Sequence, residues 1–68
     1  MNKSTKSLYV VVSDNKVIAF GNLKETIITL NRIVSNSRNY QHYYRQFKQE
    51  PLFAQQINGK SYYFQKLV

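Results

Sequence analysis

The sequence has no cysteine and a single histidine, His42. Disulfide cross-links are therefore excluded, and so are the thiolate and imidazole clusters that hold structural zinc. Stability must come from packing or from a partner chain. A chain without cysteine suits a reducing compartment, so we expect a cytoplasmic protein, with no metal or other cofactor.

Acidic residues are also scarce. Against ten lysines and arginines stand three carboxylates, Asp14, Glu25 and Glu50, which gives a formal net charge of +7. The carboxylates are scattered along the chain, and no pair is placed for general acid and base catalysis. His42 lies among cationic and amide side chains and has no acidic neighbour to orient it as a base. With only two glycines, both explained by turns, there is also no phosphate-binding loop. We therefore do not expect an enzyme.

Long apolar runs are absent as well. No stretch approaches the roughly 18 consecutive apolar residues that a membrane-spanning helix needs, so no membrane association is expected. Residues 1–6 are polar and basic, and we expect them to be a flexible N-terminus. Residues 7–68 are expected to form one domain, because a chain of 68 residues has room for a single small core.

The first half of this domain predicts a hairpin followed by a helix. Residues 8–13 are rich in β-branched and aromatic side chains and predict a strand in which Leu8, Val10 and Val12 alternate with the other three. Residues 13–16 favour a turn, and 17–20 predicts a second strand. Asn22 and Glu25 have the spacing of a helix N-cap and its reciprocal partner. A stripe at helical spacing predicts the buried face of the helix and comprises Leu23, Ile27, Leu30 and Val34. Ile28 points away from it and either packs under the hairpin or is exposed.

The second half predicts another helix and another hairpin. Ser35, Asn36 and Ser37 form a connector, and any of the three could cap the helix that follows. This helix is predicted over 39–49 by an aromatic stripe that we expect in the core, made of Tyr40, Tyr43, Tyr44 and Phe47. It should end at Glu50, which precedes a proline. Strands over 52–57 and 61–68, joined by an Asn-Gly turn, complete the pattern.

The expected fold class is therefore α+β, with the order ββααββ and two hairpins flanking a helix-turn-helix, similar to a winged helix. In the last strand, Tyr62 and Tyr63 should point to opposite faces of the sheet, so at least one of them should be partly exposed.

The second predicted helix carries the candidate binding surface. Between residues 26 and 49 there are four cations and no acid, whereas a solvated helix usually mixes both signs to gain i,i+4 pairs. The candidate contacts with nucleic acid or with a partner are Arg38, Gln41, His42, Arg45, Lys48 and Gln49 on the helix, with Lys60 as a wing contact at the tip of the last hairpin.

Several partners fit this basic face. In duplex DNA, arginine suits guanine and glutamine suits adenine in the major groove, and we expect DNA as a partner before RNA. Exposed tyrosines between cations could instead stack on single-stranded bases. The alternative is a protein-interaction module, such as a phage or mobile-element factor, that docks on an acidic surface of a host protein, inhibits it, or forms a homodimer. A structural component of a virion is a third class.

Residues 8–25, with the sequence LYVVVSDNKVIAFGNLKE, resemble the modular DNA-binding repeats attached to intron-encoded homing endonucleases. Those repeats pair a short hairpin with a helix that starts on a serine-leucine-lysine-glutamate-like motif, and Asn22 stands here where serine is usual. Ser37 to Tyr40 falls where the second helix of such a repeat begins, and residues 59–64 are similar to its closing aromatic strand. The nuclease domain is absent, so the resemblance implies binding without cleavage.

Overall fold

A computed structural model describes residues 7–67 of the chain. It contains a small α+β fold, and its elements follow the predicted order ββααββ. They are β1 (Tyr9–Ser13), β2 (Lys16–Gly21), α1 (Leu23–Ile33), α2 (Tyr40–Gln49), β3 (Leu52–Ile57) and β4 (Lys60–Lys66). The N-terminus that we predicted to be flexible, residues 1–6, lies outside the described residues, as does Val68.

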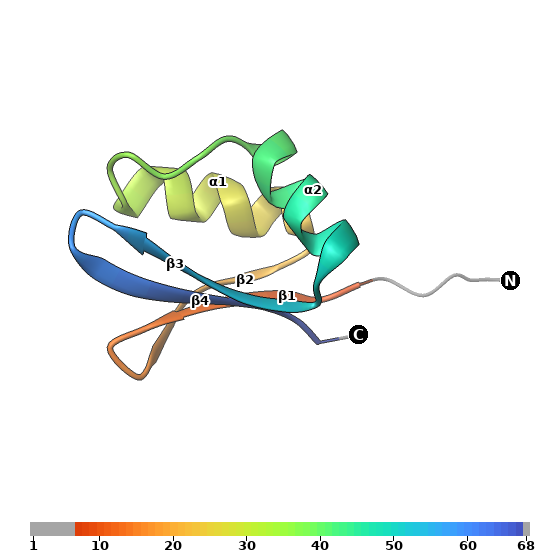
Figure 1. The fold of residues 1–68 in the computed structure, drawn as a ribbon, viewed down its shortest axis with the longest axis horizontal. Coiled ribbons are helices and arrows are strands. Elements are labelled where there is room, and N and C mark those ends of the chain that lie inside the picture. The colour runs from red at the N-terminus through yellow and green to blue at the C-terminus, as the bar shows by residue number, and fades with distance from the viewer. Residues whose placement is uncertain (1–6, 68) are drawn as a thin grey trace, which may run out of the picture.

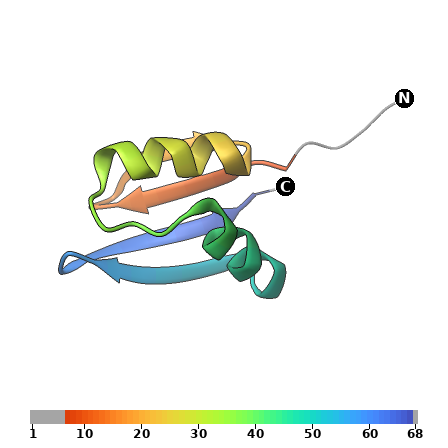
Figure 2. The same ribbon diagram turned by 90° about the horizontal axis from the view of Figure 1, so that it is seen from above.

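The four strands form one antiparallel sheet with the order β2-β1-β4-β3. The two hairpins are therefore joined side by side through β1 and β4, which pair from Tyr9–Lys66 to Val12–Tyr63. Figures 1 and 2 show both helices on one face of this sheet, and no other element of residues 7–67 lies over the opposite face. The sequence predicted the two hairpins but not the pairing of β1 with β4 that joins them. These strands are about 50 residues apart in the chain, so their pairing leaves no local signal in the sequence.

Tight turns close both hairpins. Asp14 and Asn15 have φ angles of 54° and 61°, and Asn58 and Gly59 have φ angles of 54° and 78°. Two consecutive residues with positive φ are typical of the two-residue turn that matches the twist of antiparallel strands. Asp, Asn and Gly tolerate this left-handed geometry, so the predictions of both turns are confirmed.

Helix α1 begins as its sequence predicts. The Asn22 side chain accepts a hydrogen bond of 2.8 Å from the backbone N–H of Glu25, and the Glu25 carboxylate accepts one of 3.3 Å from the backbone N–H of Asn22. This reciprocal pair satisfies two of the N–H groups that a helix start leaves open. The preceding Gly21 has a φ of 133°, and a Cβ there would lie 2.8 Å from Oε1 of Glu25. Both the backbone angle and the close carboxylate therefore favour glycine.

Helix α2 begins differently from the prediction. Its N-cap is Asn39, whose side chain accepts a hydrogen bond of 3.0 Å from the backbone N–H of His42. The prediction that the cap lies among residues 35–37 is wrong, because these residues have other partners. Ser37 donates to the carbonyl of Val34 at 3.0 Å, and Asn36 donates to the side chain of Asn58 at 2.7 Å. The connector is thus tied to the β3–β4 turn.

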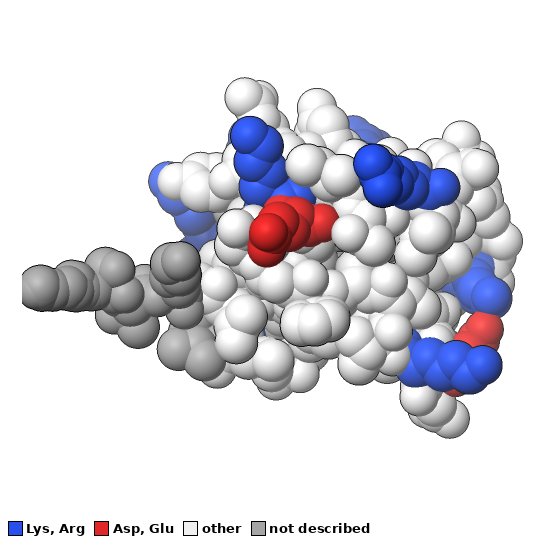
Figure 3. All heavy atoms as spheres, turned by 180° about the vertical axis from the view of Figure 1, so that it is seen from behind, with Lys and Arg blue, Asp and Glu red and all other residues white. Residues whose placement is uncertain are grey.

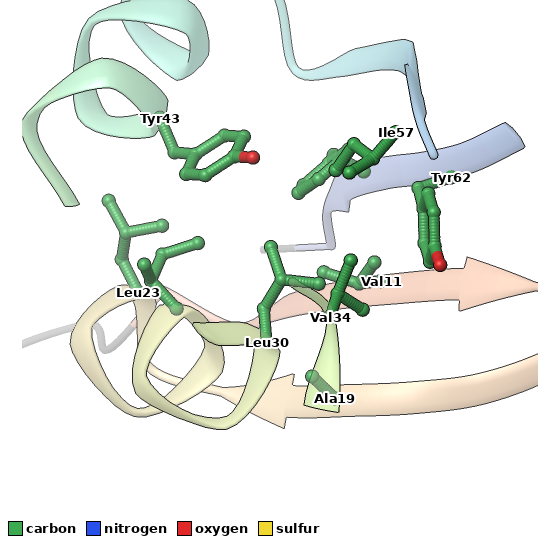
Figure 4. Close-up of a cluster of buried hydrophobic side chains, with 10 residues drawn as sticks. Val11, Ala19, Leu23, Leu30, Val34, Tyr43, Ile57 and Tyr62 are labelled. Atoms are coloured by element: carbon green, nitrogen blue, oxygen red, sulfur yellow. The ribbon is translucent and has the colours of Figure 1, made fainter. Parts of the chain in front are cut away.

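A single apolar core lies between the helices and the sheet (Figure 4). The predicted stripe of α1 is buried in it, which confirms that part of the sequence pattern; Ile28, by contrast, is exposed. From the other helix only Tyr43 is fully buried, and its ring stacks on Phe64 with the centroids 4.8 Å apart. Phe64 in turn stacks on Phe53 at 4.9 Å. This aromatic column connects α2 to both strands of the second hairpin.

The buried hydroxyl of Tyr43 is fully satisfied. It donates a hydrogen bond of 2.8 Å to Oε1 of Gln55 on β3 and accepts one of 3.1 Å from the backbone N–H of Arg38. Because an unpaired hydroxyl in a core is costly, these two bonds allow a tyrosine to occupy a site of zero exposure. They also fix α2 against β3 and against its own connector.

Strand β2 contains an irregularity that the sequence did not predict. Val11 pairs with Ala19 but Val12 pairs with Val17, so the register shifts by one residue and Ile18 has no cross-strand partner. Ile18 packs against the core although its neighbour Ala19 is buried there as well. A bulge of this kind places two successive residues on one side of the sheet, which breaks the alternation on which strand prediction depends.

Candidate nucleic-acid interface on helix α2

Two tyrosines that we expected in the core are exposed on α2. Tyr40 is 40% exposed and Tyr44 is 44% exposed, and their rings stack with centroids 5.9 Å apart. The prediction of a four-residue buried stripe is therefore wrong for this pair. The buried side of α2 is turned toward His42 and Gln46, which are half-buried together with Phe47. Because α1 covers part of the same sheet face, α2 has room to bury only a narrow strip.

Cationic and amide side chains surround this tyrosine pair. Nζ of Lys48 lies 4.9 Å from the centroid of the Tyr44 ring, a favourable cation–π distance. Together with the two tyrosines, Gln41, Arg45 and Lys48 line an open hollow of about 590 Å³. Gln41, Arg45 and Lys48 follow one another at i, i+4 and i+7, so they share one line along the helix. The hollow has aromatic, cationic and amide groups and no carboxylate in its lining.

A second line of candidate residues passes through His42. Burial lowers the pKa of His42, and the positive charges of Arg38 and then Arg45 lower it further. Burial and both charges thus favour the neutral form of the imidazole. Gln49, one turn beyond Arg45, is exposed at the C-terminal end of the helix. Of the six candidates on this helix and its connector, five are exposed, and His42 is half-buried at the margin toward β3.

We call this region the α2 surface; it comprises Arg38, Tyr40, Gln41, His42, Tyr44, Arg45, Lys48 and Gln49. Within residues 7–67 the structure records one ion pair, and it does not involve the cations of this surface. Figure 3 shows further lysines and arginines along the helix side of the molecule and around the hairpin ends. The α2 surface therefore retains its positive charge for a partner.

Lys60, the proposed wing contact, lies apart from this surface. Its Nζ is 2.9 Å from Oδ2 of Asp14, so the two hairpin turns are linked by an exposed ion pair. The hydrogen bond to Asp14, and then the charge of Asp14, raise the pKa of Lys60. Figures 1 and 2 show the β3–β4 turn at one end of the sheet, whereas α2 lies toward the other end. The structure does not bring Lys60 together with the other candidates.

Sequence reasoning weighed Tyr40 and Tyr44 as stacking groups and assigned them to the core. The position of the N-cap separates them from Tyr43. Because Asn39 is the N-cap, Tyr40 is the first residue of the helix, at its end and not at its centre. Tyr44 lies one turn later on the same side. Periodicity alone does not show how wide the buried strip of a short helix is.

Other classes of site find no support in the described part of the chain. Among residues 7–67 no group of three or more His, Cys, Asp or Glu side chains is placed to hold a metal ion. Neither α1 nor α2 is long and apolar enough to cross a membrane. Comparison of the chain with protein-family models, with curated proteins and with solved structures finds no match.

Proposed function

We propose that this chain is a small nucleic-acid-binding protein without catalytic activity, and that the α2 surface is its contact site. The observation that carries the proposal is the stacked, exposed Tyr40–Tyr44 pair beside Arg45 and Lys48. A stable fold gains little from two large aromatic rings in solvent between unpaired cations. Nucleic acid offers both a stacking partner for the rings and phosphates for the cations.

The same observation favours single strands over duplex DNA. The two stacked rings are accessible on the side of α2, and the unpaired bases of a single strand can stack on them. The bases of a duplex are already paired and stacked on one another, so they are not free to stack on the tyrosines. In the duplex alternative, α2 enters a major groove, with Gln41 and Arg45 at base edges, and the β3–β4 hairpin acts as the wing of a winged helix. Lys60 lies at the far end of the sheet and is paired with Asp14, so its position favours this duplex arrangement less than the single-strand one.

The resemblance of residues 8–25 to DNA-binding repeats of homing endonucleases stays a prediction, and it agrees with DNA as the first target to test. Docking of the α2 surface on an acidic protein remains the competing function. It would use the same cations but would not need the accessible tyrosine rings.

A fluorescence anisotropy titration tests the proposal directly. Labelled single-stranded DNA, duplex DNA and RNA of equal length are titrated at several salt concentrations. If Arg38, Arg45 and Lys48 each contact a phosphate, log affinity should fall with log salt at a slope of about −2 for a single strand and about −3 for a duplex. Absence of binding to all three at low salt would overturn the proposal.

Charge-matched variants locate the site. Arg45→Glu and Lys16→Glu change the net charge equally, but Lys16 is exposed on β2, away from the α2 surface. We expect Arg45→Glu to abolish measurable binding and Lys16→Glu to weaken it only through net charge. Equal losses in the two variants would show that binding is non-specific electrostatic attraction and would remove the α2 surface from the proposal.

Tyrosine variants separate the two nucleic-acid forms. Tyr40→Ala should weaken single-strand binding by roughly 5- to 150-fold, since stacking of one base contributes about 1–3 kcal/mol. Ile28→Ala, which removes an exposed apolar side chain of α1, is the control and should have no effect. A duplex bound more tightly than the single strand, with affinity unchanged in Tyr40→Ala, would favour the winged-helix arrangement.

A further inference from the structure

The sheet face opposite the helices is largely apolar, and no other element among residues 7–67 covers it. Cross-strand partners share a face of an antiparallel sheet, so the register identifies its residues. Val10 pairs with both Phe20 and Gln65, and Val12 pairs with both Val17 and Tyr63. On the other edge, Gln65 pairs with Leu52 and Tyr63 pairs with Ala54. We call the resulting two rows the open sheet face; they are Phe20, Val10, Gln65 and Leu52, and Val17, Val12, Tyr63 and Ala54.

This face is distinct from the core. Val10 is buried, with 8% exposure, but is not part of the core cluster. The other large side chains there are far more accessible. Phe20 is 70% exposed, Val17 59%, Leu52 55% and Tyr63 50%. Contiguous apolar surface of several hundred Å² is uncommon on a monomer and usually marks a contact with another molecule.

The two rows of the open sheet face carry no charged side chain. None of its eight residues is charged, in a chain with ten lysines and arginines and three acids. Helix α2, which carries Arg45 and Lys48, lies on the other face of the sheet (Figure 1). Nucleic acid is a poor occupant, because phosphates require cations within reach and this face offers none. An apolar partner surface without charge fits it best.

We propose that the occupant is a second copy of this chain, and that two copies stack their open sheet faces into a β-sandwich dimer. Each copy carries a net charge of +7, so self-association requires a contact surface that keeps the charges apart. The open sheet face does so, because each copy would present its helix layer outward. A two-fold axis through the face would bring the same apolar patch of both copies together, as in most homodimers.

The size of this side of the sheet is comparable to that of a small dimer interface. Four strands about 4.8 Å apart, each about six residues long at about 3.4 Å per residue, give the whole side a footprint of roughly 20 by 20 Å. With protruding rings such as Phe20 and Tyr63, its accessible area approaches the roughly 500 Å² per partner that a specific interface requires at minimum. Two such sheets pack about 10 Å apart, with side chains from both filling the space between them.

Sedimentation equilibrium of the full chain tests the dimer. The wild type should sediment at twice the chain mass of 8.1 kDa, in low and high salt alike, because the contact contains no charges. Phe20→Lys and Tyr63→Lys should each shift the equilibrium to monomer by at least 100-fold in the dissociation constant. Ile28→Lys adds the same charge at an exposed isoleucine of α1 and should leave the dimer intact.

A wild type that remains monomeric at millimolar concentration would overturn the proposal. So would a dimer that survives both open-face variants, since it would have to use another surface such as the edges of β2 and β3. Circular dichroism checks that each variant is folded.

A cross-linking experiment covers the case in which a lysine variant fails to fold. The chain has no cysteine, so Tyr63→Cys and Ile28→Cys each introduce a unique thiol. A short bismaleimide should link two copies of Tyr63→Cys efficiently and should leave Ile28→Cys mostly unlinked. Equal or reversed yields would contradict a contact through the open sheet face. The oligomer tests involve no nucleic acid, so their result is independent of the function proposed for the α2 surface.

Discussion

The two helices are almost equal in length, with 11 residues in α1 and 10 in α2, but they are used differently. Helix α1 buries four residues, Leu23, Thr26, Ile27 and Leu30, whereas α2 buries only Tyr43. The start of α1 is secured by a reciprocal capping box, while α2 has a single capping hydrogen bond from Asn39. The helix with the larger buried area supports the fold, which leaves the other helix with most of its surface available for a partner.

This difference has a physical origin. In α1 the apolar residues are aliphatic and repeat on a stripe wide enough to cover the sheet. In α2 only Tyr43 is fully buried, with Phe47 partly buried beside it, and Tyr43 is held by two hydrogen bonds in addition to packing. The exposed side of α2 can therefore change, or bind a ligand, with little consequence for the core.

The largest contrast is expected between Leu30→Ala and Tyr40→Ala. Leu30 has zero exposure, so its truncation leaves a cavity and should lower the free energy of unfolding by about 2–5 kcal/mol. Tyr40→Ala should change it by less than about 0.5 kcal/mol, since the ring is substantially exposed. Urea unfolding followed by circular dichroism measures both. Similar losses in the two variants would mean that Tyr40 supports the fold and would weaken its role as a binding residue.

Removal of the Tyr43 hydroxyl should have the next largest effect. Tyr43→Phe keeps the stacking on Phe64 but leaves Gln55 and the Arg38 N–H without this partner, so we expect a loss of about 1–3 kcal/mol. Tyr44→Phe is the control, because Tyr44 is exposed and its change should be close to zero. Thermal unfolding of the two variants gives the comparison. If Tyr43→Phe were neutral, packing alone would hold α2 in place.

The two N-caps should differ by a smaller amount. Asn22→Ala removes the acceptor for the Glu25 N–H at a helix that the core requires, and we expect a loss of about 1 kcal/mol. Asn39→Ala removes only the acceptor for the His42 N–H, and the loss should be the lesser of the two. Chemical denaturation measured side by side checks the order. The reverse order would show that the α2 cap also organises the connector.

The smallest effect is expected from the titration of His42. Its pKa in the folded chain lies below the ordinary value of about 6.5, mainly because of burial. The unfolded chain therefore binds more protons in the window just below pH 6.5, and stability should fall as the pH decreases through it. His42→Gln should remove this dependence. Protonation should also add a cation to the α2 surface, so nucleic-acid affinity should rise at acidic pH in the wild type and not in the variant.

Local features of the fold were predictable because they depend on neighbouring residues. The Asn22–Glu25 box, both left-handed turns and the end of α2 before Pro51 all follow from the preferences of a few side chains. The exposure of Tyr63 opposite the buried Tyr62 also agrees with the prediction, since strand alternation requires it. The bulge at Ile18 was not predictable, because it depends on how β1 and β2 fit over α1.

The candidate site was predictable only in its charges. The sequence of α2 places Gln41, Arg45 and Lys48 on one line whatever the tertiary arrangement. Whether Tyr40 and Tyr44 join them depends on how far α2 is rotated on the sheet. That rotation is set by the packing of Tyr43 on Phe64 and by its bond to Gln55, residues that are distant in the sequence. The separation of Lys60 from the other candidate residues could not be predicted from the sequence either, because it also depends on the tertiary arrangement.

The sequence by itself determined the order of the elements, both hairpin turns, the cap of the first helix, the excess of positive charge and the absence of acids from the second helix. These features depend on composition and on contacts within one turn or one hairpin. Only the tertiary structure decided that β1 pairs with β4, and this pairing joins two hairpins into one sheet with one covered and one open face. Long-range pairing and the rotation of α2 result from competition among all buried side chains for one small core, and no single segment encodes its outcome.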